Sequence, residues 1–287
     1  MGRKILAMSM VLVMLLAFSA CGGETLPTAE QIIDGAIQAQ DDIRTYEFEM
    51  GMTMDMAGEA EGEAFEATIG MDYSGALDTD NKEMRMTVTA SAVATGEEEA
   101  ETALEAYIVD GTGYSKTIAP GTEPEWEADE FSEEEWEETW EGIVEVLSLA
   151  APQLELLEAA EAEVIGSETV KGVDCYVLRL TPNIKQLWDT IMQQATMGFG
   201  GGLGLPEFTE EIFNEASYSL SVEQWVAKDT YFLMKVEIDT TIELTAEAMQ
   251  VTEGEMTIDT VLNLLAYNYN QPVSIELPPE AEEAAEY

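Results

Sequence analysis

Three stretches in the first hundred residues alternate between apolar and polar side chains, and this period of two constrains the fold more than any other feature. Their apolar members are Tyr46, Phe48, Met50, Met52, Met54 and Met56 in the first, Phe65, Ala67, Ile69, Met71 and Tyr73 in the second, and Met84, Met86, Val88, Ala90 and Ala92 in the third. Successive side chains of a strand point to opposite faces. Each run therefore predicts an antiparallel strand with one apolar and one solvated face.

The same period returns in the C-terminal third. The apolar positions there are Tyr218, Leu220, Val222, Val236, Ile238, Ile242, Leu244, Met256, Ile258 and Leu262. Asp110-Gly111 and Lys171-Gly172 separate further strand-like runs and predict tight hairpins. The chain shows no regular strand-helix-strand alternation, so we expect about ten strands in an antiparallel arrangement.

Helical periodicity appears in four segments. Thr28 and Gln31 form a capping-box pattern that opens an amphipathic helix over 29–43, and Ser132 and Glu135 repeat this pattern before a central helix. A second central helix is expected over 152–161 and a third over 184–192. Because strands lie on both sides of these helices, residues 29–278 are expected to form a single domain, in which one large sheet closes around or against the helices. Residues 279–287 are expected to be a frayed acidic tail.

The N-terminus has the features of an export signal. Arg3 and Lys4 precede an uncharged run that ends at Ala20, shorter than the roughly 18 to 20 apolar residues of a membrane-spanning helix. Phe18-Ser19-Ala20-Cys21 resembles the lipobox of bacterial lipoproteins, although Leu is usual where Phe18 stands. We therefore expect residues 1–20 to be removed, Cys21 to carry lipid, and residues 21–28 to tether the domain to the extracytoplasmic face of the cell membrane, or of the outer membrane if the cell has one.

Acidic residues dominate the charge. Asp and Glu number 59 against 11 Lys and Arg, giving a net charge of -48, and the chain contains no His. A nucleic-acid partner is excluded because its phosphates must be neutralised by clustered Lys and Arg. The absence of His removes imidazole bases and His-containing zinc sites. With so many carboxylates, two that are close in sequence carry no catalytic information, and we expect no enzyme, metal site or cofactor.

Three motifs that suggest chemistry have a simpler interpretation. Asp78-Thr79-Asp80-Asn81 begins like a calcium loop, but Lys82 occupies a ligand position, which leaves at most adventitious cation binding. The glycine-rich segment 197–206 lacks the spacing of a phosphate-binding loop and is interpreted as a flexible lid or linker. If Cys21 carries lipid, Cys175 has no disulfide partner and is expected to be a buried structural thiol.

The order of landmarks along the chain resembles the superfamily of the lipoprotein carrier LolA and the mycobacterial lipoproteins LppX and LprG. The resemblance is carried by the lipobox, the N-terminal helix, the meandering strands, the central helices, and the segments 170–178, 223–230 and 269–278. It implies an α+β, mainly β fold: a large curved antiparallel sheet, or incompletely closed barrel, with helices covering its open concave side. In that superfamily the concave face is apolar and receives acyl chains of lipids or lipoproteins. Such a cavity is recognised by its shape and assigns no residue here a binding role.

Methionine is the most informative candidate for a binding surface. Met50, Met52, Met54, Met84 and Met86 are expected on adjacent strands, where flexible and polarizable side chains suit irregular acyl chains. Trp136, Trp140 and Trp188 lie on helical stripes that must cover something apolar, whether packed sheet or lipid. For each of these eight residues, the competing interpretation is ordinary core packing.

These observations favour a non-enzymatic, membrane-anchored lipoprotein that binds or transfers a lipid or acyl chain. An envelope sensor or protein-interaction module on the same scaffold, with a filled core, is the alternative, and a secreted hydrolase is a weaker third hypothesis. The sequence identifies neither the ligand nor a protein partner. A continuous apolar cavity of several hundred Å³ would separate the first two hypotheses.

Overall fold

The computed structural model describes residues 27–60, 62–96, 98–132, 136–137, 139–140, 142, 160–182, 216–247 and 254–284. Several sequence-based expectations lie outside these residues: the signal peptide, Cys21, the glycine-rich segment 197–206, and the helix expected over 184–192 with Trp188. The same is true of the helix expected over 152–161, apart from its last two residues.

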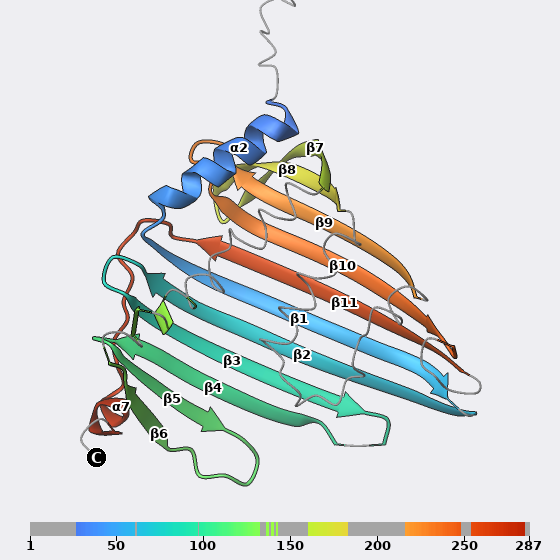
Figure 1. The fold of residues 1–287 in the computed structure, drawn as a ribbon, viewed down its shortest axis with the longest axis horizontal. Coiled ribbons are helices and arrows are strands. Elements are labelled where there is room, and N and C mark those ends of the chain that lie inside the picture. Colours follow the sequence, from blue (N-terminus) through green and yellow to red (C-terminus); the bar gives the residue numbers. More distant parts are fainter. Residues whose placement is uncertain are drawn as a thin grey trace, which may run out of the picture.

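One sheet of eleven strands dominates the described part of the chain (Figure 1). Its strands are β1 Thr45–Ala60, β2 Glu63–Asp78, β3 Glu83–Ala94, β4 Ala100–Val109, β5 Thr112–Ile118, β6 Trp126–Glu130, β7 Ala160–Val170, β8 Val173–Pro182, β9 Ser217–Ala227, β10 Leu233–Thr245 and β11 Gly254–Tyr267. Their order is β6-β5-β4-β3-β2-β1-β11-β10-β9-β8-β7, and neighbours are antiparallel. The edge strands β6 and β7 are not paired with each other, so the sheet is open and the predicted fold class is confirmed.

Both predicted hairpins are tight two-residue turns. Asp110 and Gly111 have φ values of 51° and 76°, and Lys171 and Gly172 have 47° and 87°. Two consecutive positive φ angles match the right-handed twist of the strands that the turn joins. The turns fix the register of β4 with β5 and of β7 with β8, and thereby decide which side chains share a face.

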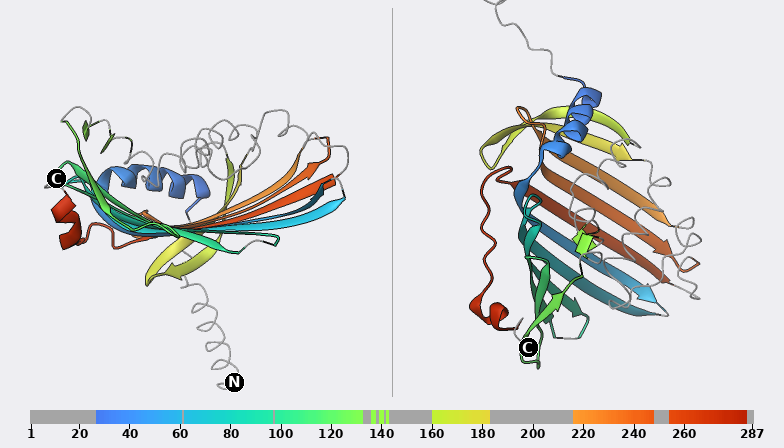
Figure 2. Two further views of the ribbon diagram at one scale, coloured as in Figure 1. Left: turned by 90° about the horizontal axis from the view of Figure 1, so that it is seen from below. Right: turned by 60° about the vertical axis from the view of Figure 1, so that its left-hand side comes forward.

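The sheet bends into a trough, and two glycines lie under aromatic rings at opposite ends of the β1–β2 pair (Figure 2). Phe48 is paired with Gly75, and a Cβ at Gly75 would lie 2.7 Å from the ring of Phe48. Phe65 is paired with Gly58, where an added Cβ would lie 2.9 Å from the ring of Phe65. Rings that pack over glycine allow two strands to approach closely and the sheet to coil.

Helix α2, Ala29–Ala39, lies in the trough of the sheet across its β8–β10 side (Figure 2). Its predicted capping box is present: the Gln31 backbone amide donates to Thr28 Oγ1 at 3.2 Å, and Thr28 N donates to Gln31 Oε1 at 3.0 Å. The predicted helix is one turn shorter than expected, because Gln40–Asp42 form a 3-10 turn, η1. Ile32 and Ala36 are buried against the sheet, while Gly35 admits the ring of Tyr231, which an added Cβ would meet at 2.6 Å.

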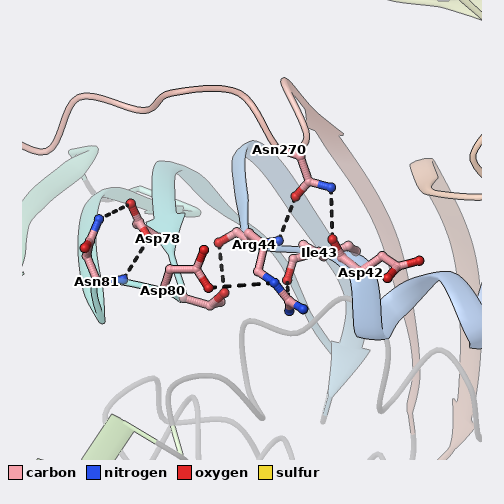
Figure 3. A network of polar contacts seen from close by, with 8 residues as sticks. Asp42, Ile43, Arg44, Asp78, Asp80, Asn81 and Asn270 are labelled. Carbon is pink, nitrogen blue, oxygen red and sulfur yellow. Dashed lines mark hydrogen bonds and ion pairs between the residues drawn. The ribbon is translucent and has the colours of Figure 1, made fainter.

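A network of polar contacts joins the end of η1 to the segment after β11 (Figure 3). The Arg44 backbone amide donates to Asn270 Oδ1 at 2.7 Å, and Asn270 Nδ2 donates to the Asp42 carbonyl at 2.9 Å. Asn270 has a φ of 56°, a conformation that Asn adopts more readily than most residues. One side chain therefore fixes the angle at which the helix leaves the sheet.

We expect Asn270→Ala to lower the free energy of unfolding by about 2 kcal/mol, because it removes two hydrogen bonds and places Ala in a left-handed conformation. Urea denaturation of the purified chain measures the change. Asn81→Ala is the matched control: Asn81 Nδ2 donates to Asp78 Oδ2 at 2.8 Å, but the Asn81 backbone amide keeps its bond to Asp78 Oδ1. Equal losses in the two variants would contradict the special role of Asn270.

Two expectations from the sequence are wrong at their boundaries. Ala160 and Glu161 were expected at the end of a helix but begin β7. Residues 279–287 were expected to fray, yet Pro279–Ala284 form helix α7, which contacts β6 and buries Ala281 completely. The proline at the first helical position and the acidic first turn favour this short helix, and burial of Ala281 holds it in place.

Candidate apolar binding face

The face of the sheet toward α2, which we call the concave face, is apolar from strand to strand. Register places Met52 of β1 beside Met71 of β2 on one side and Leu262 of β11 on the other, with Ile238 of β10 next in the row. The neighbouring rows repeat this composition. They contain Val236, Leu264, Met50, Tyr73 and Val88 on one side, and Ile242, Ile258, Met56 and Ala67 farther on. Period-two alternation in each strand thus adds up to a continuous apolar surface.

The five predicted methionines all lie on this face, but they do not lie on adjacent strands. Met50, Met52 and Met54 belong to β1, whereas Met84 and Met86 belong to β3. Strand β2 lies between these strands and contributes Met71 to the same face. The expectation of adjacency is corrected because it counted only the methionine-rich runs, while the hairpin order places the second run between them.

The predicted residues divide among separate apolar clusters. Met50 packs against the cluster under α2, and Met54 packs with Leu244, Met256 and Ile258 at the far end of the trough. Met84 and Met86 join a third cluster around Tyr46 and Phe48, to which Trp136 and Trp140 also belong. The members of this third cluster are far apart in sequence, and the sheet brings them together.

Burial separates packing residues from residues that a ligand could reach. Met84 is 5% exposed and Trp140 is 6% exposed, so both serve the core. Met50, Met52, Met54, Met86 and Trp136 are half-buried. Trp136 stacks on Phe131 with ring centroids 5.9 Å apart and lies 5.5 Å from the ring of Trp140.

Sequence reasoning missed part of the surface. Met56, Met71, Ile238 and Leu262 contribute to the concave face although they were not named as candidates. Their place in period-two runs was the available signal. Gln224 is also on this face, fully buried beside Leu178 and Val236, and the sequence gave no indication that β9 would carry a polar side chain into the core.

The opposite, convex face carries the polar members of the same strands. Thr68 Oγ1 donates to Asp55 Oδ1, and Thr241 Oγ1 donates to Asp259 Oδ1, each at 2.6 Å. Asp55 and Asp259 are directly paired across β1 and β11. Like charges in this arrangement repel each other, which is the local cost of an acidic face.

We expect Asp55→Asn to raise the free energy of unfolding by about 0.5 kcal/mol, since it relieves that repulsion and keeps an acceptor for Thr68. The gain is expected to shrink at high salt. Urea titrations at low and high salt measure both effects. Asp239→Asn is the control, because Asp239 is paired with Val261 and Ser221 and faces no acid. The idea fails if both variants gain the same stability.

Cys175 is fully buried on the convex side with Val177, Trp225, Ala227 and Met234. Burial raises the pKa of its thiol to about 11, with a smaller contribution from Asp174. The thiol therefore carries little thiolate at neutral pH, which agrees with the expected structural role. Asp78, the first residue of the calcium-like motif, instead accepts two hydrogen bonds from Asn81 and closes the β2–β3 turn.

Helices in the described residues are all too short or too polar to cross a membrane. Within the same residues, no group of three or more acidic or Cys side chains is arranged to hold a metal ion. The side chains that the fold gathers on the concave face are aliphatic, aromatic and thioether groups, whose chemistry is contact with other apolar groups.

Comparison with solved structures returns the superfamily that the sequence resembles. The lipoprotein LppX of Mycobacterium tuberculosis aligns over 86% of this chain and 98% of its own, at 11% identity and a TM-score of 0.38. LprF from Mycobacterium bovis aligns over 87% and 96%, at 14% identity and a TM-score of 0.43. A putative outer membrane lipoprotein-sorting protein domain from Vibrio parahaemolyticus aligns over 86% and 95%, at 13% identity and a TM-score of 0.22.

These values concern the arrangement of strands and say nothing about a ligand of this chain. A search of curated proteins finds no match. A family model, described as a family of unknown function, DUF6612, matches residues 28–286. That match includes α2, all eleven strands and α7, and the chain therefore belongs to the DUF6612 family.

Proposed function

We propose that the protein is an exported lipoprotein, anchored at the extracytoplasmic face of a membrane through lipid on Cys21, that binds a lipid or acyl chain on its concave face. The role is binding or transfer of the ligand without chemical conversion. Domain boundaries at 29–278 and removal of residues 1–20 are part of this proposal.

The observation that carries the proposal is the half-buried centre of the concave face. Met50, Met52, Met54 and Met56 form one line along β1, and each has an apolar or threonine neighbour on β11. Helix α2 covers the side of the trough around Leu178, Val222 and Val236. The methionine line therefore lies between a covered, rigid region and the far-end cluster around Leu244 and Met256.

Such a surface suits a flexible hydrocarbon chain. Each buried methylene contributes about 0.8 kcal/mol, so an acyl chain of ordinary length binds strongly if the sheet removes most of it from water. Methionine has three rotatable bonds and fills irregular gaps, which lets one surface accept chains of different shape. The acidic residues stay on the convex face, where they keep the exported domain soluble.

Native mass spectrometry of the mature chain tests the proposal directly. A lipid adduct should be retained from membrane extracts, and a fluorescent fatty-acyl probe should compete with it. If the folded chain carries no lipid and does not bind the probe, the proposal fails, and a sensor or interaction module with a filled core becomes the better account.

A further inference from the structure

The convex face has a hollow of about 480 Å³ that runs across the middle of the sheet. Two adjacent rows of paired residues flank it, and both cross β10, β11, β1, β2 and β3. One row contains Lys235, Leu265, Glu49, Ser74 and Thr87, and the other has Asn263, Gly51, Asp72 and Thr89 over its last four strands. Five strands at about 4.8 Å spacing give the hollow a length of about 19 Å.

The hollow exists because Gly51 has no side chain at its centre. A Cβ at Gly51 would contact only the Asp72 carboxylate, at 3.3 Å. The floor of the hollow is therefore backbone, and its walls are the side chains of the two rows. A larger side chain at position 51 would fill the space without meeting a rigid neighbour.

The charged groups at the β10 and β11 end already have partners. Glu49 accepts a hydrogen bond from the Tyr267 hydroxyl at 2.8 Å and lies 3.6 Å from Lys171 Nζ. Lys235 Nζ lies 2.6 Å from Glu237 Oε1 and 4.1 Å from the centre of the Trp225 ring. These contacts hold both charged side chains in fixed positions at one end of the hollow.

The remaining polar side chains are small and are not engaged with one another. Ser74, Thr87, Thr89 and Asn263 make no side-chain hydrogen bond to other described residues, and Asp72 adds one carboxylate. Together they offer hydroxyl, amide and carboxylate groups that both donate and accept. A ligand rich in hydroxyl groups has the matching property at every position.

We propose that this groove binds a neutral oligosaccharide, on the face of the sheet opposite to the apolar one. The length of the groove fits a chain of several sugar units, and the strongly acidic protein disfavours an anionic ligand. A cationic peptide would pair with carboxylates over the whole surface, whereas the neutral side chains of Ser74, Thr87 and Asn263 are gathered here. The site is independent of the lipid-binding function.

Isothermal titration of the mature chain with maltotetraose and chitotetraose tests the assignment. We expect saturable binding of at least one tetrasaccharide, insensitive to NaCl because the ligand is neutral. Gly51→Leu should weaken it at least about tenfold by filling the groove, and Asn263→Ala about fivefold by removing hydrogen bonds. Thr53→Leu places the same side chain two residues along β1 on the same face, outside the groove, and should bind like the unmodified chain.

Gly51→Leu is expected to fold, since the new side chain meets one flexible carboxylate and Gly is unfavourable within a strand. Thermal melting of each variant confirms folding before titration. The proposal is overturned if neither tetrasaccharide binds the folded chain, or if Thr53→Leu loses as much affinity as Gly51→Leu. Salt-sensitive binding of a lysine tripeptide, with neither sugar bound, would overturn it as well.

Discussion

Cys21→Ala is expected to move the protein from the membrane fraction to the soluble fraction almost completely. Removal of residues 1–20 takes away Arg3 and Lys4, so the net charge changes from -48 to -50. Anionic headgroups repel such a chain, and nothing but the acyl chains on Cys21 then holds it at the bilayer. Fractionation at physiological salt, with an antibody to the protein, measures the distribution.

Cys175→Ala is the matched control for this change. It removes the other cysteine, which is buried in the sheet, and leaves the proposed anchor intact. This variant should stay with the membrane and should still incorporate a palmitate analogue, whereas Cys21→Ala should not. Membrane retention of Cys21→Ala at physiological salt would show that the body of the protein has its own affinity for the bilayer.

Met52→Glu is expected to weaken binding of an acyl probe about 100-fold. The residue lies at the centre of the concave face between Met71 and Leu262, so a bound chain would have to cover the new carboxylate. Burying a polar group without a partner costs about 3 kcal/mol, which corresponds to that loss of affinity. Fluorescence titration of the mature chain with a fatty-acyl probe measures it.

Thr53→Glu provides the control, because it adds the same charge at the next position of β1 on the convex face. It should bind the probe like the unmodified chain. Met52→Gln adds polarity without charge and should give an intermediate loss, while Met52→Leu should bind nearly normally. Similar affinities for Met52→Glu and Thr53→Glu, in chains with normal thermal melting, would place the ligand elsewhere.

The strands and their faces could be predicted from the sequence because period-two alternation depends only on local geometry. Tyr46 to Met56 has alternating polarity, and the structure places those apolar side chains on one face. Two-residue turns such as Asp110-Gly111 likewise have a local cause, the two positive φ angles. Local causes can be read from one short segment at a time.

The contacts between distant segments could not be predicted in this way. Packing of Trp136 and Trp140 against Met84 and Met86 depends on how the sheet bends, and the hollow above Gly51 depends on the register of five strands. Alternation also does not reveal that β2 separates the two methionine runs. Each of these features follows from strand order, which alternation does not specify.

The pairing of β1 with β11 has a consequence for export. These strands lie at the centre of the sheet, and the bond between Glu49 and Tyr267 spans 218 residues of sequence. Contacts of such separation form late, because closing a long loop precedes any gain from pairing. The central strand pair therefore cannot assemble until the C-terminal strand has emerged from the translocation channel. The polar, charged residues of each strand then help to keep the waiting chain from aggregating.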